Sequence, residues 1–90
     1  MCTSIVEVVG VEGAGKGEGG WFALERAVVS YDHPHHALLE EAITLDFVNS
    51  SLGAGARVAA ELTLAGAKEL AAGLARAIAA AEIEEAARRR

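Results

Sequence analysis

Three histidines and three carboxylates are gathered in one short stretch, YDHPHHALLEEA, at residues 31–42. Imidazole and carboxylate groups are common protein ligands of zinc and of iron(II). Pro34 fixes its own φ and disfavours the helical region for His33, so a strand that precedes it must end here. If a short helical turn begins at Pro34, His36 and Glu40 are four residues apart and share one face.

This spacing predicts a divalent metal site, with zinc as the first expectation and iron as the alternative. The favoured ligands are His33, His36, Glu40 and, as a weaker fourth, Cys2. Glu41 replaces Glu40 if the turn is not helical. Asp32 is expected to orient an imidazole and not to bind the metal itself. The competing interpretation is that a histidine-rich turn on an acidic protein is only solvated polar surface.

The glycine-rich stretch at residues 10–20 matches two phosphate-binding patterns in form only. It contains GxxxxGK and GxGxxG, but Gly17 stands where a P-loop needs Ser or Thr for the metal. Both motifs also need a helix N-terminus directed at the phosphates, whereas the residues from Trp21 onward are typical of a strand. The prediction is a flexible hairpin loop and no nucleotide site.

The elements that must position the histidines are four strands and one helix. Alternating and β-branched residues predict strands over 4–12, 20–31, 42–49 and 56–62. After Thr63, a favourable N-cap, the period changes to that of a helix, with an apolar stripe of Ala67, Leu70, Leu74, Ile78 and Ala81. The expected fold is one α+β domain over residues 1–90: a four-stranded antiparallel sheet with one C-terminal helix, ββββα in two layers.

If these strands follow one another in an up-and-down order, Cys2, the histidine turn and the start of the helix lie at the same end of the strands. The glycine-rich stretch then lies at the opposite end of the strands. One helix covers only one face of such a sheet, yet the first two strands are apolar on both faces. We therefore expect a homo-oligomer, a two-fold dimer or a higher assembly, that buries the second face.

Charge and hydropathy exclude several classes of partner. The formal net charge is -5, and the only basic run, at residues 88–90, follows three glutamates and suits the end of a helix. No nucleic acid is therefore expected as a partner. No apolar run is long enough to cross a membrane, and the N-terminus has no export signal. With a single cysteine, an internal disulfide is excluded, and the expected location is the cytoplasm. The sequence does not identify a small-molecule ligand, which stays unknown.

Three stretches carry a resemblance to a known family: MCTSIVEVVGVEGAGKGEGGWF, YDHPHHALLEEAITLDFVN and GARVAAELTLAGAKEL. They resemble a family of small bacterial proteins of unknown function, mainly actinobacterial, over nearly the whole chain. That family has the pattern DHPxHA, followed by a histidine where this chain has Glu41. The resemblance implies that Asp32, His33, Pro34 and His36 matter more than His35. It implies no known activity and no catalytic residue.

Two functions follow as hypotheses. The first is a small cytosolic metal-binding protein, or a metalloenzyme, with its site in the turn after the second strand. The alternative is a non-enzymatic module for homo-oligomerisation or protein interaction. They differ in where substitutions matter, because alanine at His33 and His36 abolishes the first function and leaves the second intact.

Overall fold

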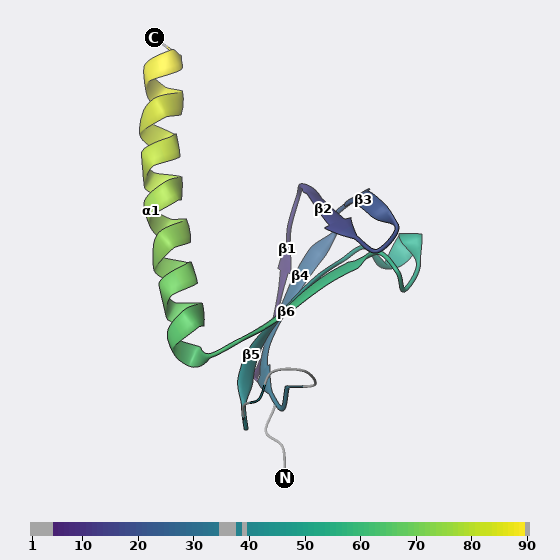
Figure 1. Ribbon diagram of the computed structural model, residues 1–90. Coiled ribbons are helices and arrows are strands. Elements are labelled where there is room, and N and C mark those ends of the chain that lie inside the picture. Colours follow the sequence, from purple (N-terminus) through teal and green to yellow (C-terminus); the bar gives the residue numbers. More distant parts are fainter. Residues whose placement is uncertain (1–4, 35–37, 39, 90) are drawn as a thin grey trace.

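The structure is a computed structural model that describes residues 5–34, 38 and 40–89. It has the predicted α+β character, with a four-stranded antiparallel sheet, a second sheet of two strands and one C-terminal helix (Figure 1). The larger sheet consists of β1 (Ile5–Gly10), β4 (Arg26–Asp32), β5 (Ala42–Val48) and β6 (Arg57–Leu62). The remaining elements are β2 (Ala14–Gly17), β3 (Gly20–Ala23), the 3₁₀ turn η1 (Ser50–Leu52) and the helix α1 (Leu64–Arg88).

The four strands of the larger sheet lie in the order β1-β4-β5-β6, and every neighbouring pair is antiparallel. This is the up-and-down order expected from the sequence. Because side chains alternate along each strand, the register defines two faces. The apolar face carries Ile5, Glu7, Val9, Ala27, Val29, Tyr31, Ile43, Leu45, Phe47, Val58, Ala60 and Leu62. The polar face carries Val6, Val8, Arg26, Val28, Ser30, Asp32, Thr44, Asp46, Val48, Arg57, Ala59 and Glu61.

The glycine-rich stretch forms a β-hairpin with the residues that follow it, so the prediction of one continuous strand over residues 20–31 is wrong. β2 pairs with β3 in a separate sheet, and the chain changes partners at Leu24. There, Leu24 N donates to Gly13 O at 2.8 Å, and the next residue donates to Val48 O at 2.9 Å. A Cβ at Gly15 would lie 2.9 Å from Leu24 Cδ2, and one at Gly17 would lie 3.1 Å from a backbone oxygen of β6. These two glycines therefore allow the hairpin to approach the rest of the molecule closely.

Helix α1 begins at the predicted cap, because Thr63 Oγ1 accepts a hydrogen bond from Gly66 N at 2.9 Å. Its 25 residues correspond to about 37 Å of length. The helix contacts β5 and β6, and its C-terminal half extends past the sheet (Figure 1). The apolar stripe of α1 remains at least half exposed at Leu70, Leu74 and Ile78.

The described part of the chain has a very small interior. Its buried hydrophobic residues are Ala27, Ala42 and Ala56, and none of its large side chains is fully buried. The radius of gyration is 15.5 Å, whereas a compact chain of this length has a value of about 12 Å. No helix in the described residues is long and apolar enough to cross a membrane. One chain by itself thus leaves most of its apolar side chains accessible to solvent.

Candidate functional site

His33 lies just beyond β4 and is held by contacts on both its backbone and its ring. Its backbone N–H donates to Asp32 Oδ1 at 2.7 Å. Its ring Nδ1 lies 3.1 Å from the Glu40 carbonyl oxygen and 3.3 Å from Glu41 Oε1. The His33 ring therefore links the end of β4 to the residues that follow the turn, although the His33 side chain is 59% exposed.

These contacts determine the protonation chemistry of His33. A carbonyl oxygen can only accept a hydrogen bond, so Nδ1 carries the proton and Nε2 keeps a lone pair in the neutral ring. The hydrogen bond to the Glu40 carbonyl, and then the negative charge of Glu41, raise the pKa of His33 above 6.5. Desolvation opposes this shift and Asp32 adds to it. The ring can therefore act as a metal ligand or a base through Nε2, or as a cation at mildly acidic pH.

The predicted ligands divide into described and undescribed residues. Cys2 and His36 lie outside the described residues, as does His35. Glu40 is exposed and contributes its backbone carbonyl to His33. The carboxylate that lies near the ring is that of Glu41, the alternative considered from the sequence. In residues 5–34, 38 and 40–89, no three His, Cys, Asp or Glu side chains are grouped so that they could hold a metal ion.

A hollow of about 570 Å³ lies beside His33 on the polar face of the sheet. It is lined by Ser30, Asp32, His33, Thr44, Asp46, Arg57, Ala59, Ala60 and Glu61. Arg57 Nε donates to Asp46 Oδ1 at 2.6 Å, and this ion pair raises the pKa of Arg57. The hydroxyls of Ser30 and Thr44 are hydrogen-bonded to each other. Three carboxylates face one guanidinium and one imidazole, so the hollow is acidic overall.

The polar residues of β4, β5 and β6 were not predicted from the sequence to form one group. The signal was present, because Thr44 and Asp46 are two residues apart, as are Ser30 and Asp32. Such spacing indicates a shared face within each strand. Only the register, which sets Ser30 opposite Thr44 and Thr44 opposite Glu61, brings the three strands' polar residues together.

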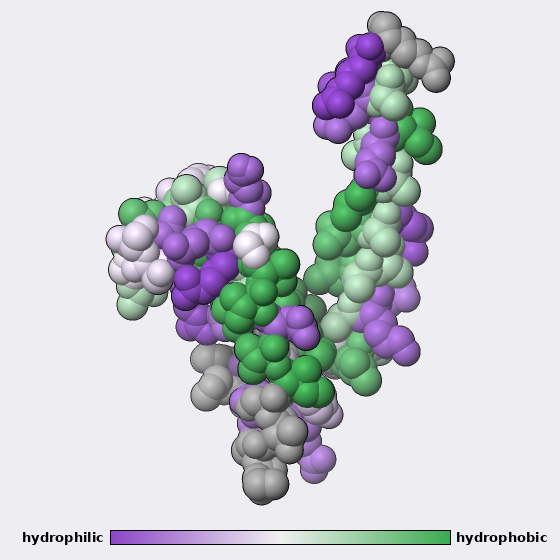
Figure 2. All heavy atoms as spheres, turned by 180° about the vertical axis from the view of Figure 1, so that it is seen from behind, coloured by the Kyte–Doolittle hydropathy of each residue, from purple (hydrophilic) through white to green (hydrophobic). Residues whose placement is uncertain are grey.

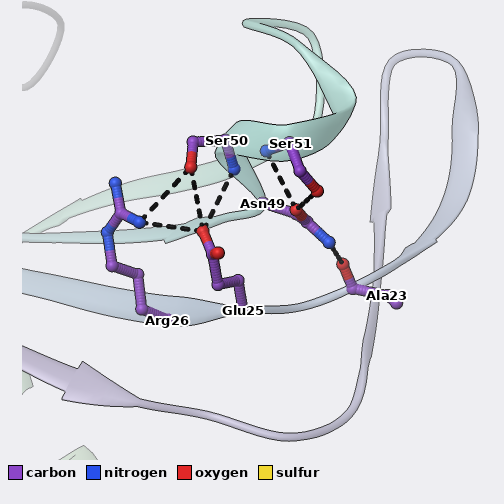
Figure 3. Close-up of polar contacts among 6 residues, drawn as sticks. All are labelled: Ala23, Glu25, Arg26, Asn49, Ser50 and Ser51. Atoms are coloured by element: carbon purple, nitrogen blue, oxygen red, sulfur yellow. Dashed lines mark hydrogen bonds and ion pairs between the residues drawn. The ribbon is translucent and has the colours of Figure 1, made fainter.

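A second polar cluster joins the hairpin to the turn after β5, and it was also missed. Asn49 Nδ2 donates to Ala23 O at 2.9 Å, while Asn49 Oδ1 accepts from Ser51 Oγ at 2.6 Å (Figure 3). The carboxylate of Glu25 accepts from both Ser50 N and Ser50 Oγ. These hydrogen bonds from Ser50 are the main reason that the pKa of Glu25 is lowered. The cluster is exposed and positions the turn after β5 near β3. Its hydrogen bonds are typical of a structural cap.

A further unusual feature of the described residues is their exposed apolar surface. Figure 2 shows hydrophobic side chains gathered over the middle of the molecule and along the side of α1 that is turned toward it. The side chains that are at least half exposed include Ile5, Val6, Val8 and Val9 of β1 and Leu64, Leu70, Leu74 and Ile78 of α1. Soluble monomers rarely expose so many large apolar groups in contiguous patches. This surface is therefore a second candidate functional site, beside the histidine turn.

Comparison with known proteins gives a family without an assigned activity. No curated protein and no solved structure matches the chain. The model of a family of unknown function, DUF6295, matches residues 1–87. This match agrees with the resemblance to an uncharacterised family noted from the sequence motifs. Because the match spans nearly the whole chain, the protein belongs to the DUF6295 family of unknown function.

Proposed function

We propose that the protein functions as a homo-oligomer, a dimer or a higher symmetric assembly, in which further copies cover the apolar surfaces of each chain. The observation that carries this proposal is the accessible surface of a single chain, 6919 Å². A compact monomer of 9.3 kDa exposes only about 5,000 Å². Each chain therefore exposes roughly 1,900 Å² more than a compact protein of its mass.

The size of this excess fits burial against a second copy. Two chains have a combined excess of roughly 3,800 Å², and obligate homodimers bury about 2,000–5,000 Å² in total. The radius of gyration points the same way, since 15.5 Å exceeds the roughly 12 Å of a compact chain of this length. A symmetric dimer has two apolar sheet faces and two α1 stripes, so the stripe of one chain can pack on the sheet face of the other. The two-layer arrangement of helix on sheet is then formed by residues of both chains.

Light scattering at micromolar concentration tests the assembly, and a mass of 9.3 kDa contradicts it. Leu74→Glu and Leu52→Glu form a matched pair, because the two leucines are 59% and 58% exposed in one chain. Leu74 belongs to the α1 stripe, while Leu52 is in η1. We expect Leu74→Glu to shift the protein toward monomer and Leu52→Glu to leave the mass of the assembly unchanged.

A second candidate function is metal binding in the histidine turn, and the contact of His33 favours it. The hydrogen bond from Nδ1 to the Glu40 carbonyl fixes the ring and leaves Nε2 as the donor atom, which is how metal-binding histidines are usually oriented. We propose zinc, or iron, as the ion, with ligands from His33, His36, Glu40 and Cys2. Glu41 is the alternative carboxylate. A free thiol is kept reduced in the cytosol, so this proposal includes a cytoplasmic location.

Elemental analysis of protein purified without a histidine tag tests this second function. The expected result is one zinc or iron ion per site after supply of the metal, with loss of the ion in His33→Ala. His35→Ala is the matched control, because His35 is adjacent in sequence but is not a proposed ligand. Metal that stays substoichiometric after zinc and iron have been supplied would refute metal binding and leave the oligomer proposal intact.

A further inference from the structure

Strand β1 is an edge strand of the larger sheet, and all of its residues are exposed. The exposure of its four large aliphatic side chains ranges from 50% at Val9 to 63% at Val8. Ile5 and Val9 belong to the apolar face, while Val6 and Val8 belong to the polar face. A partner that lies on one face of the sheet can cover only half of them.

The backbone of β1 is equally open for pairing. Val11, one residue beyond the strand, donates its N–H to Glu25 O at 3.2 Å, in the same register as β1 with β4. Because antiparallel strands alternate the direction of their backbone groups, the odd-numbered residues of β1 point toward β4. The N–H and C=O groups of Val6, Val8 and Gly10 therefore point away from the sheet, into the position of a further strand.

β1 also lacks the features by which proteins protect an exposed edge. It contains no proline, its register with β4 is continuous, and Glu7 is its only charged residue. The opposite edge strand, β6, is different, since β2 contacts it and it carries the charged residues Arg57 and Glu61. A further strand is thus favoured at β1 and disfavoured at β6.

We propose that β1 pairs antiparallel with β1 of a second copy, with Val8 on the two-fold axis, so that the two sheets form one continuous sheet of eight strands. This inference rests on the proposed self-association and specifies its geometry. Centring the pair on Val8 sets Val6 opposite Gly10 of the partner subunit, so all three outward-pointing residues are paired. Centring it on Glu7 instead would set two glutamates directly opposite each other, which is unfavourable.

This pairing also explains how the apolar surfaces are combined. A two-fold axis perpendicular to a sheet keeps both apolar faces on the same side, where they join into one surface. The two copies of α1 are likewise on the same side as each other. Each helix contacts β5 and β6 of its own sheet, and its C-terminal half extends past that sheet (Figure 1), so its apolar stripe stays available to a partner chain.

Disulfide trapping at single cysteines tests the register. Val8→Cys and Val6→Cys are each introduced into the full chain together with Cys2→Ser, which removes the natural thiol. Across the proposed axis, the two Val8 Cα atoms are about 5.5 Å apart, within the range of a disulfide. The two Val6 Cα atoms are four residues out of register and about 14 Å apart. Val8→Cys should therefore form a covalent dimer under mild oxidation, seen on a non-reducing gel, and Val6→Cys should not.

Val6 is a close control, because it is the same residue type, on the same strand and the same face. A protein that is dimeric in solution but is trapped by neither cysteine, or equally by both, overturns the β1 pairing while self-association stands. A monomer in solution overturns both. As a second measurement, Val8→Lys places two like charges at the axis and should weaken dimerisation at least tenfold, with an unchanged circular dichroism spectrum. A dimer of Val8→Lys as tight as the natural protein would also refute the pairing.

Discussion

A hundredfold dilution should lower the melting temperature of this protein by about 7 °C, because unfolding of an assembly also separates its chains. For a dimer, dilution by this factor favours the separated chains by about 2.7 kcal/mol, which is RT ln 100. The entropy of unfolding is about 2.1 cal/mol/K per residue, or roughly 0.38 kcal/mol/K for two chains of 90 residues. The ratio of these two quantities gives the shift.

Thermal scans followed by far-ultraviolet circular dichroism measure this shift, because α1 contributes most of the helical signal. Samples at 1 and 100 μM in the same buffer span the required range. A monomer unfolds at the same temperature at both concentrations. A melting temperature that does not change on dilution, with scans shown to be reversible, would therefore refute the inference drawn from the excess surface of 1,900 Å² or so.

Three further predictions concern single residues. Asn49→Ala removes the hydrogen bonds to Ala23 O and to Ser51 and should lower the free energy of unfolding by about 1–2 kcal/mol in a urea titration at fixed protein concentration. Thr63→Ala removes the cap of α1 and should lower it by about 1 kcal/mol, whereas Thr63→Ser should have little effect; equal losses would contradict the capping role. NMR titration should give His33 a pKa above 6.5, and Glu41→Gln should lower it. Since the pKa is raised in the folded state, the associated stability is present below pH 6.5 and is lost as the pH rises through the folded pKa.

Much of the local structure could be predicted from the order of residue types. The strands β1, β5 and β6 correspond closely to the ranges 4–12, 42–49 and 56–62, since alternation and β-branched residues are properties of neighbouring positions. The cap at Thr63 was predictable for the same reason, because its partner, Gly66, is three residues away. The open surface of β1 was also signalled by its apolar residues on both faces.

Contacts between distant residues were decided by the tertiary structure. The alternating glycines of β2 resembled a loop, and only the close approach of Leu24 and β6 shows why small residues are needed there. Likewise, Asp46 and Arg57 form their ion pair across two strands, and Asn49 bonds to Ala23 across 26 positions of the chain. Periodicity states which face a residue occupies, but it does not state which residue of another strand lies opposite. That information arises from strand register, which the packing of the whole sheet determines.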